Sequence, residues 1–330
     1  MDKNVERLIK ILKTSKGKKL LITHIKDPDG MFSMVEVAKH INTKGCILIP
    51  LNHAYLHSEE LVTLLNSFEV LASTDMPPFG KSIEWFFDHH ETSAKYVEKT
   101  IIKHCHFNPE AISAYSLVAN TLLSEEEKKT SEQMEKAIGR TDSATYSSLP
   151  PASLEELEKC DQAWKYSILI DCVNEDVNAF TGLFNYLINN SPEEAFKRED
   201  FRQKMESQLL NFKKVVKIAK SIKEENSKEG IILISKEKLE DWVLMLCLYK
   251  LGFNVIAIVS KQPGSHKIAF GINPKFNPEY AVNDIAEKLG GGGHKKAAAA
   301  HLSEDKLESS IEVVKEEFKR RNIAFSVNEL

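Results

Sequence analysis

The sequence predicts a two-domain α/β protein, in which an N-terminal, doubly wound, mainly parallel sheet with helices on both faces precedes a smaller C-terminal α/β domain. Short β-type runs alternate with helical patterns from Lys18 onward, and the same alternation restarts at Gly230. A length of 330 residues also exceeds what one small core organises. We place the domains at 1–190 and 229–330, with a helical linker over 191–228 between them.

Composition places the chain among ordinary globular proteins and limits its partners. Hydrophobic residues make up 42% and charged residues 28%, a balance that supports a folded core. The formal net charge is −4, so the chain lacks the overall positive field of proteins that bind duplex nucleic acid without regard to its sequence. A short nucleotide ligand stays compatible with this charge, because a local positive patch or a metal ion can hold it.

Cysteine usage and the N-terminus predict where the protein works. The five cysteines are odd in number and scattered, with no CxxC pair, which favours free thiols in a reducing compartment. Residues 1–19 have the pattern of an amphipathic helix and lack the continuous apolar stretch of a signal peptide. No apolar run approaches the ~20 residues that span a bilayer. We therefore expect a cytoplasmic protein without a membrane partner.

In the N-terminal half, helical spacing of apolar residues predicts a first helix over 3–14. Lys18–His24 is a β-type run, the following Asp27–Gly30 (DPDG) predicts a turn, and helical spacing returns over 31–41. The alternation then continues with strands at Cys46–Pro50, Glu69–Asp75 and Ile83–Phe87, and with helices at 59–67, 111–123, 125–138 and within 153–187.

In the C-terminal half, a Lys- and Glu-rich connecting helix leads to a domain boundary near 226–230. Beyond Gly290–Gly293, the run Lys295–His301 (KKAAAAH) suggests a tightly packed helix of small residues. The other predicted elements are strands at Gly230–Ser235, Asn254–Ser260, His266–Ile272 and Ile323–Val327, and helices at Leu239–Leu251, Val282–Leu289 and Ile311–Arg321.

The site prediction starts from Ile83–Thr92 (IEWFFDHHET), an apolar strand that ends in Asp88-His89-His90. Ionisable residues at the tip of a buried strand are costly unless something uses them, and imidazole with carboxylate is a ligand set for divalent metals. Taken singly, such residues have structural explanations as core histidines, turn residues or exposed carboxylates. Together they fall at the ends of predicted elements on one side of a parallel sheet, which favours a metal site built from His24, Asp27, Asp29, Asp75, His89 and Asp142.

These residues resemble a known family. HxxDxDG at His24–Gly30, Asp75 after an apolar strand, Asp88-His89-His90, and Asp142 within GRTDS resemble the four motifs of the DHH phosphoesterases. Gly291-Gly292-Gly293-His294 with the following alanines is similar to the signature of the associated DHHA1 domain. The resemblance covers nearly the whole chain, and the pair of signatures is far more specific than either one alone.

The resemblance implies a site for two metal ions, usually Mn²⁺, with Mg²⁺ or Co²⁺ as substitutes. His24, Asp27 and Asp75 would hold one ion, while Asp29, His89 and Asp142 would hold the other together with a bridging Asp75. Asp88 would orient a neighbouring histidine, and His90 would face the substrate phosphate. The residues implied to bind the substrate are Gly291, Gly292, Gly293, His294 and Lys295.

The glycine run admits two explanations. A single glycine is the usual helix stop, whereas a run of four suggests close approach to an anion in front of a following helix N-terminus.

One departure from the family pattern concerns the part of the site that is implied to bind the substrate. Relatives often carry an arginine on the strand that here reads Lys267–Ile272 and has none, so Asn273 or Lys275 would have to substitute.

The activity implied by the resemblance is metal-dependent phosphodiester hydrolysis. The chain looks most like the nanoRNase type, which degrades short single-stranded oligonucleotides to mononucleotides and often also dephosphorylates 3′-phosphoadenosine 5′-phosphate. A RecJ-type single-strand exonuclease and a hydrolase of linear dinucleotides stay open, as does a degenerate member that binds nucleotides without catalysis. Relatives often pair, so the resemblance also implies a homodimer.

Overall fold

The computed structural model describes residues 2–174, 176–222, 229–237, 239–262 and 265–330. The chain folds into two compact units. The N-terminal unit comprises Met1–Tyr146 and Leu157–Gln208, and the C-terminal unit comprises Ser147–Glu156 and Leu209–Leu330. The predicted boundaries at 190 and 228 stay a prediction. None of the described helices combines the length and the apolar character needed to cross a bilayer.

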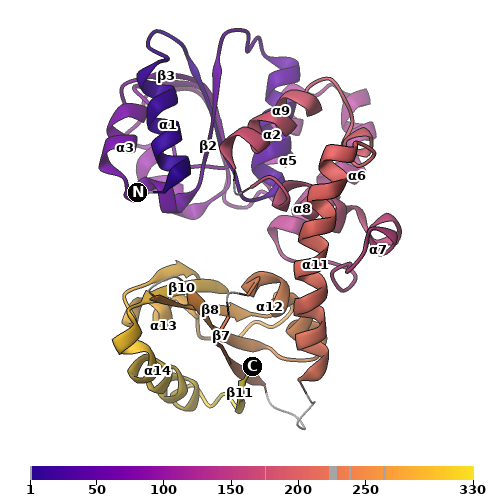
Figure 1. Cartoon of the computed structure of the whole chain (residues 1–330). Helices are drawn as coiled ribbons and strands as arrows, with labels where there is room; N and C mark the ends of the chain where they lie inside the picture. The colour runs from indigo at the N-terminus through magenta and orange to yellow at the C-terminus, as the bar shows by residue number, and fades with distance from the viewer. Residues whose placement is uncertain (1, 175, 223–228, 238, 263–264) are drawn as a thin grey trace. The chain divides into compact units, whose positions relative to one another are not determined.

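The N-terminal unit is built on a sheet whose neighbouring strands are all parallel, as the sequence predicted (Figure 1). Its edge strand β5 was not predicted, because histidines and a lysine interrupt its apolar pattern. Every other residue of β5 is at least half-buried against β4, which is enough to hold an edge strand in place. The strand order is β2 (Ile47–Leu51), β1 (Leu20–His24), β3 (Glu69–Thr74), β4 (Ser82–Asp88) and β5 (Ile102–Phe107).

Helices cover this sheet in the doubly wound manner that the sequence predicted. Helix α2 (Pro28–His40) packs on β1 and β3, and α5 (Ala114–Leu122) packs on β4 and against α2. Figure 1 shows α1 (Lys3–Lys13) and α3 (Glu59–Leu65) on the other side. The remaining helices of this unit are α4 (Ala94–Val97), α6 (Glu125–Asp142), α8 (Gln162–Asp171), α9 (Val177–Leu187) and α10 (Pro192–Ala195), with 3₁₀ turns at His53–His57 and Glu91–Ser93.

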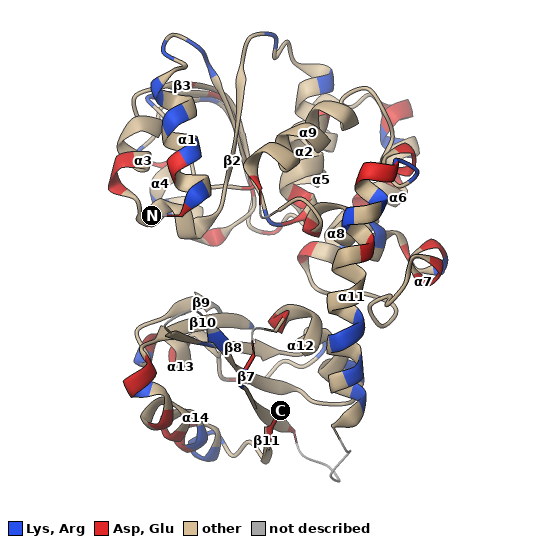
Figure 2. Ribbon diagram, viewed as in Figure 1, with Lys and Arg blue, Asp and Glu red and all other residues tan. Residues whose placement is uncertain are grey.

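Two of the predicted boundaries that were wrong in this unit concern the site. Helix α2 begins at Pro28, not at Met31, because Asp27 caps it and accepts a hydrogen bond of 3.0 Å from the Gly30 amide. Proline at the first helical position fits such a start. Helix α6 continues to Asp142, beyond the predicted end at Ile138. Figure 2 shows the charged residues along α6, in agreement with the surface position predicted for it.

The C-terminal unit has a mixed sheet, with β11, β6 and β7 parallel and β7, β8, β10 and β9 antiparallel. Alternate residues of β7 and β8, among them Val255 and Phe270, form a core with Ile285 and Phe318. The strands are β6 (Gly230–Ser235), β7 (Val255–Gln262), β8 (Ser265–Ile272), β9 (Gly292–His294), β10 (Ala297–Leu302) and β11 (Phe325–Glu329). The helices are α12 (Asp241–Lys250), α13 (Asn283–Lys288) and α14 (Leu307–Arg320), while α7 (Leu154–Lys159) and α11 (Glu199–Ser221) each span a boundary between the units.

The helix predicted over Lys295–His301 is wrong. The glycine run continues into β9, Lys295 and Lys296 form a two-residue turn, and the alanines form β10. Alanine favours helices, but here each alanine from Ala297 to Ala300 pairs with a residue of β8. Small side chains allow β10 to lie under the glycines, so tertiary pairing overrides the local propensity. No helix N-terminus therefore follows the glycines.

An ion-pair cluster on α14 generates a stability prediction. The carboxylate of Glu317 accepts from Arg320 at 2.8 Å and from Lys288 at 2.5 Å. The hydrogen bond with Arg320 outweighs the effect of burial and, with Lys288, lowers the pKa of Glu317 from 4.5 to about 2. Because the folded pKa is the lower one, this stabilisation is complete above pH 4.5 and is lost as the pH falls toward 2.

We expect Glu317→Gln to lower the free energy of unfolding by about 1 kcal/mol at pH 7, allowing for solvent screening of the exposed partners. The difference from wild type should shrink between pH 4.5 and pH 3 in urea titrations, since the wild-type carboxylate loses its advantage there. Glu316→Gln is the matched control, because Glu316 is the exposed neighbour on the same helix. A difference that is constant with pH would contradict the ionic origin of the effect.

Candidate metal centre

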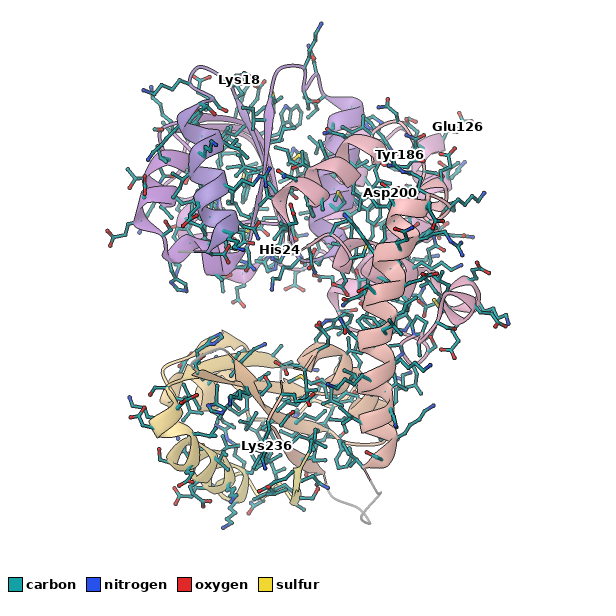
Figure 3. All side chains as sticks on the ribbon, in the orientation of Figure 1. Lys18, His24, Glu126, Tyr186, Asp200 and Lys236 are labelled. Atoms are coloured by element: carbon teal, nitrogen blue, oxygen red, sulfur yellow. The ribbon has the colours of Figure 1, made fainter. Side chains whose placement is uncertain are left out.

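Acidic and histidine side chains gather at one edge of the N-terminal sheet. Since the strands are parallel, their carboxyl ends share this edge, where open α/β sheets bind ligands. His24 ends β1 and Asp88 ends β4, and Figure 3 labels His24 at this edge. The structure brings together every residue predicted from the N-terminal motifs: His24, Asp27, Asp29, Asp75, Asp88, His89, His90 and Asp142.

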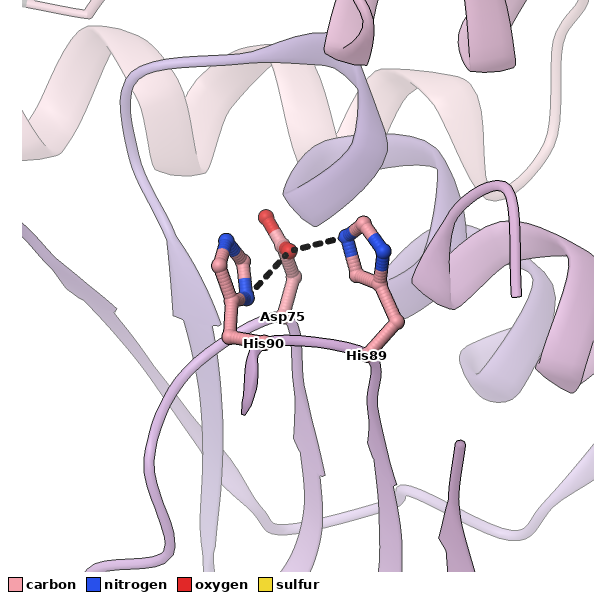
Figure 4. Close-up of side chains that lie close together, drawn as sticks. All are labelled: Asp75, His89 and His90. Carbon is pink, nitrogen blue, oxygen red and sulfur yellow. Dashed lines mark ion pairs between the residues drawn. The ribbon is translucent and has the colours of Figure 1, made fainter. Parts of the chain in front are cut away.

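Asp75 lies at the centre of the cluster. It follows β3 with a φ of 58°, in the left-handed region, and its amide donates to the Phe87 carbonyl at 2.9 Å. Such a conformation is uncommon for a residue other than glycine, although aspartate tolerates it better than most. The bend directs a carboxylate that is only 1% exposed between His89 and His90, as Figure 4 shows. Backbone strain thus places the central carboxylate.

The two oxygens of Asp75 face two different groups of side chains. Oδ2 lies 3.4 Å from His24 Nδ1, which in turn lies 2.5 Å from Asp27 Oδ2. Oδ1 lies 3.7 Å from His89 Nε2, and that nitrogen is also 3.5 Å from Asp29 Oδ2 and 3.7 Å from Asp142 Oδ1. The geometry therefore provides three overlapping groups of ligand atoms, which are linked through Asp75 and His89: His24, Asp27 and Asp75; Asp75, His89 and His90; and Asp29, His89 and Asp142.

Asp29 is held from three directions. It belongs to the first turn of α2, and its carboxylate accepts from the amides of Ala114 and Tyr115 at 2.6 and 2.7 Å. The Ser33 hydroxyl donates to the same carboxylate at 3.1 Å. The two amides belong to the first turn of α5, where donors are left without partners inside the helix. Asp29 therefore ties α2 to α5 and has a fixed orientation toward His89.

His89 has the geometry of a metal-ligating histidine. Its Nδ1 lies 3.2 Å from the Ala111 carbonyl, to which it donates, so Nε2 keeps its lone pair. Burial, followed by the charge of His90, lowers the pKa of His89 and favours the neutral ring. The Nε2 atom is buried and lacks a hydrogen-bond partner among the described residues. This nitrogen is directed at Asp29, Asp75 and Asp142.

His90 is arranged differently, because Asp88 holds its ring. Asp88 Oδ1 accepts from the amides of His89 and His90, at 2.8 and 3.1 Å, and from His90 Nδ1 at 2.8 Å. Burial lowers the pKa of His90, but the hydrogen bond and charge of Asp88 outweigh it and raise that pKa to about 9. His90 Nδ1 is also 3.6 Å from Asp75 Oδ1, within reach of a shared ion. The hydrogen bond between His90 Nδ1 and Asp88 competes with metal binding by the same nitrogen.

The residues fit a divalent metal. His24 Nδ1, His89 Nε2 and both oxygens of Asp75 are buried and lack hydrogen-bond partners in the described part of the chain. Leaving such atoms unsatisfied costs free energy, which a bound cation would recover. Hard carboxylate oxygens combined with imidazole nitrogens match Mn²⁺ and neighbouring first-row ions.

The electrostatic interactions among these side chains also favour a bound cation. Burial, with a contribution from the charge of Asp27, raises the pKa of Asp29 to about 7. Burial and the charge of Asp29 raise the pKa of Asp142 to about 8. Burial and the charge of Asp27 raise the pKa of Asp75 well above its ordinary value. Burial would also raise the pKa of Asp27, but the charge of His24 reverses this. The carboxylates repel one another, and added positive charge would relieve that repulsion.

Two threonine hydroxyls and a glycine hold the backbone segments next to the centre together. The Thr23 hydroxyl donates to the Gly30 carbonyl at 2.6 Å, so the Thr74 hydroxyl, 2.9 Å away, is left to donate to Thr23. These bonds tie β1, β3 and the start of α2 together. A Cβ atom added at Gly30 would lie 2.5 Å from the His24 carbonyl oxygen and 2.8 Å from the His24 Cβ. Only glycine allows α2 to approach β1 this closely.

His53 is a further residue at the centre, and the sequence analysis missed it. Its ring lies 5.4 Å from the ring of His24 and 6.4 Å from that of His90, edge-on to both. Burial, followed by the charges of His24 and His90, lowers the pKa of His53 to about 4. The signal was available, because His53 follows β2 at the same carboxyl edge as the predicted ligands.

Comparisons with known proteins identify a domain and a fold. Residues 243–320 match the DHHA1 domain model, and no curated protein matches the sequence. The structure is similar to a pGpG-specific phosphodiesterase, PggH of Vibrio cholerae, with a TM-score of 0.62 and 16% identity over 92% of this chain and 99% of that one. The chain therefore carries a DHHA1 domain at residues 243–320, in a fold that it shares with these phosphodiesterase and exonuclease structures.

Two RecJ structures show the same fold. A manganese-bound exonuclease RecJ has a TM-score of 0.55 and 14% identity, over 97% of this chain and 95% of that one. RecJ of Thermus thermophilus in complex with Mn²⁺ has a TM-score of 0.54 and 12% identity, over 99% of this chain. This chain spans 56% of the Thermus protein, about half its length.

The glycine run of the DHHA1 domain is largely explained by the backbone. Gly290, with a φ of 78°, and Gly291 close a Schellman motif on α13, in which their amides donate to the carbonyls of Glu287 and Ala286. A Cβ atom at Gly291 would lie 2.1 Å from the Ala299 carbonyl oxygen, and one at Gly293 would lie 2.6 Å from that of Ala297. Gly292 alone has open space around its Cβ position.

The strand that lacks the family arginine, β8, has a packing reason for a glycine. A Cβ atom at Gly271 would lie 2.1 Å from the hydroxyl oxygen of Tyr249 and 2.8 Å from the sulfur of Met245. Both side chains come from α12, which lies against this part of the sheet. A side chain at this position of β8 would therefore require Tyr249 and Met245 to move.

The close approach at Gly30 generates the first prediction for the centre. Gly30→Ala should force α2 away from His24, cost about 1–3 kcal/mol of stability, and abolish tight Mn²⁺ binding. Gly182→Ala is the control, since Gly182 lies in α9 with open space at its Cβ position and should be neutral or stabilising. Thermal denaturation and equilibrium dialysis with Mn²⁺ measure both effects. Full Mn²⁺ binding by Gly30→Ala would show that this contact does not shape the centre.

The repulsion among the carboxylates leads to a second prediction for the centre. Asp75→Asn removes a carboxyl group whose ionisation burial and the neighbouring carboxylates oppose in the folded state, and asparagine suits the left-handed backbone, so the melting temperature of the variant without metal should exceed that of wild type. Mn²⁺ at about 100 times its Kd should stabilise the wild type by roughly 2.7 kcal/mol and the variant far less. Differential scanning calorimetry with and without EDTA measures both. A variant that is less stable without metal and fully responsive to Mn²⁺ would refute the account.

Proposed function

We propose that this chain is a manganese-dependent phosphodiesterase of the nuclease type, which hydrolyses short single-stranded oligonucleotides to mononucleotides. The observation that carries this proposal is the series of three overlapping ligand sets, linked through Asp75 and His89, with buried ligand atoms directed inward. Two adjacent divalent ions are the usual arrangement for phosphodiester hydrolysis. PggH is a phosphodiesterase and RecJ an exonuclease, so both related folds serve cleavage of such bonds.

The chain's own residues would prepare the reaction. His24, Asp27 and Asp75 would hold one ion, and Asp29, Asp75, His89 and Asp142 the other. Bound ions supply positive charge to phosphate oxygens and lower the pKa of water. Asp29 cannot rotate, because two amides and a hydroxyl hold it, and Ala111 fixes the ring of His89.

His90 and His53 would act on the substrate side of the centre. Asp88 engages His90 Nδ1, so a proton delivered to a substrate oxygen would come from Nε2. His53 is exposed and lies edge-on to His24 and His90, where a phosphate or base next to the centre would meet it. We assign His90 a catalytic role, Asp88 a positioning role for His90, and His53 a role in positioning the substrate.

Substrate recognition by the DHHA1 domain would use the β9–β10 hairpin. The proposed residues are Gly291, Gly292, Gly293, His294 and Lys295, and Lys295 is exposed at the turn. Gly292 is informative, because the fold itself does not require a glycine there. A backbone that must be open for a phosphate or nucleotide would explain it.

Gly292→Ala should therefore leave the melting temperature within about 1–2 °C of wild type and raise KM for a short RNA at least tenfold. Gly291→Ala is the contrasting variant, because its Cβ atom would meet the backbone of β10 and should destabilise the C-terminal unit. Steady-state kinetics on a trinucleotide, together with thermal melts, separate the two effects. An unchanged KM in Gly292→Ala would remove the hairpin from the substrate site.

The substrate test compares labelled RNA and DNA of two to ten nucleotides, pGpG and 3′-phosphoadenosine 5′-phosphate, with Mn²⁺ and with EDTA. We expect short RNA to be cleaved to mononucleotides with Mn²⁺ alone, and Asp75→Asn to be at least about a hundredfold slower. Asp305→Asn, an exposed change in the C-terminal unit, is the control.

The same experiment separates the alternatives. Cleavage restricted to pGpG would favour a linear dinucleotide phosphodiesterase, which the similarity to PggH supports. Preference for longer single-stranded DNA would favour a RecJ-type exonuclease. Two bound ions without turnover on any substrate would indicate a nucleotide-binding protein and overturn the proposed activity.

Location and assembly belong to the same proposal. All five cysteines are free, and a reducing cytoplasm suits such thiols. We propose a cytoplasmic enzyme whose partner is its oligonucleotide substrate, and a homodimer on the strength of the family resemblance. Mg²⁺ and Co²⁺ are proposed as substitutes for Mn²⁺, since both accept the same donor set.

A further inference from the structure

A second concave site lies at the amino edge of the N-terminal sheet. A hollow of about 630 Å³ is rimmed by Lys13, Lys16, Lys18, Lys19 and Lys81. We call it the basic hollow. The metal centre does not use any of these residues, and the motifs of the sequence did not single them out.

The basic hollow and the metal centre lie at opposite ends of the same strands. Lys18 and Lys19 precede β1, whereas His24 ends it, and Figure 3 labels Lys18 and His24 at opposite ends of the N-terminal unit. Likewise Phe68 precedes β3, whereas Asp75 follows it. At about 3.3 Å per residue, strands of this length separate the two sites by roughly 15–20 Å. A ligand in one site would not touch the other.

The charge of the hollow is not neutralised locally. Lys13 pairs with Glu60 at 2.6 Å and Lys19 with Glu84 at 3.1 Å. Lys16, Lys18 and Lys81 are exposed and have no ion-pair partner in the part of the chain that the structure describes. Figure 2 shows the lysines near the end of α1, in a chain whose net charge is −4. Such a local excess of positive charge attracts anions.

The lining is not only charged. Phe68 is 8% exposed and Leu64 is half-buried, and both contribute an apolar surface between the lysines. Glu69 adds one exposed carboxylate to the lining. Small-molecule sites typically measure about 300–1,000 Å³ and combine apolar walls with a few polar groups. An inorganic anion would use the lysines and leave the apolar surface unused.

We propose that the basic hollow is a second ligand site, which binds a nucleoside 5′-oligophosphate. The base would lie on Phe68 and Leu64, the phosphate chain would contact Lys16, Lys18 and Lys81, and Glu69 would accept from a base amino group or a ribose hydroxyl. This site is independent of the metal centre and of the reaction proposed for it. Its distance from that centre makes it a place where a nucleotide binds without being cleaved.

The test is equilibrium dialysis of the full chain against ATP, AMP and inorganic tripolyphosphate, with EDTA present throughout. Lys16→Ala/Lys18→Ala/Lys81→Ala removes the unpaired cations of the hollow. Lys99→Ala/Lys129→Ala/Lys197→Ala is the matched control, with the same change in charge at exposed lysines of the same unit. Asp75→Asn reports on any nucleotide held by the metal centre, and thermal melts check that each variant folds.

We expect the wild type, Asp75→Asn and the control triple variant each to bind one ATP per chain. In the triple variant Lys16→Ala/Lys18→Ala/Lys81→Ala, the affinity for ATP should fall at least tenfold. ATP should bind more tightly than AMP, because of its phosphates, and more tightly than tripolyphosphate, because of its base. Equal affinity for ATP in the two triple variants would overturn the proposal. So would loss of the site in Asp75→Asn, or equal affinity for ATP and tripolyphosphate.

Discussion

Mutual repulsion within a cluster of carboxylates, of which Asp29 and Asp75 are buried, is the constraint on which the centre of the N-terminal unit depends. Asp27, Asp29, Asp75 and Asp142 converge because β3 ends, α2 begins and α6 ends at one edge of a parallel sheet. Burial alone would favour their neutral forms, and their proximity adds to this effect. A fold that keeps such a cluster depends on positive charge from histidines and metal ions. The cost in stability is concentrated where the chemistry would occur.

The surrounding structure shows how the chain maintains this arrangement. Gly30 lets α2 begin directly over His24, and the hydroxyls of Thr23 and Thr74 lock the strands beneath. Asp29 joins α2 to the start of α5, so one side chain serves both as a structural tie and as a candidate ligand. Positioning by backbone amides, close packing and left-handed geometry explains why the centre is set before any ion binds.

Much of the fold could be predicted from the sequence, because buried parallel strands are apolar and end abruptly. The tip of β4 at Asp88-His89-His90 was evident for this reason, and the convergence of strand ends followed from the parallel topology. The errors came from residues with more than one use. Pro28 in DPDG reads as a turn residue but begins a helix, and the alanines after Lys296 favour a helix but pair with β8. His53 was missed although it closely follows the predicted strand Cys46–Pro50, and the structure places its ring beside that of His24.

The glycine run shows a limit of motif reasoning within the DHHA1 domain. The run Lys295–His301 behind it suggested a helix of small residues, whereas the structure has a hairpin there, and Gly290, Gly291 and Gly293 each meet a backbone requirement. A run of four glycines therefore contains one position, Gly292, that packing leaves unexplained. Separating what the fold needs from what a ligand needs is possible only with the neighbouring strand in place.

The central claim is that Asp75 bridges two metal ions. Anomalous diffraction at the manganese edge, on crystals grown with Mn²⁺, tests it most directly. The account predicts two peaks about 3.5–4 Å apart, one beside His24 and Asp27 and the other beside Asp29, His89 and Asp142, with Asp75 between them. A single peak, or peaks that do not share Asp75, would contradict it.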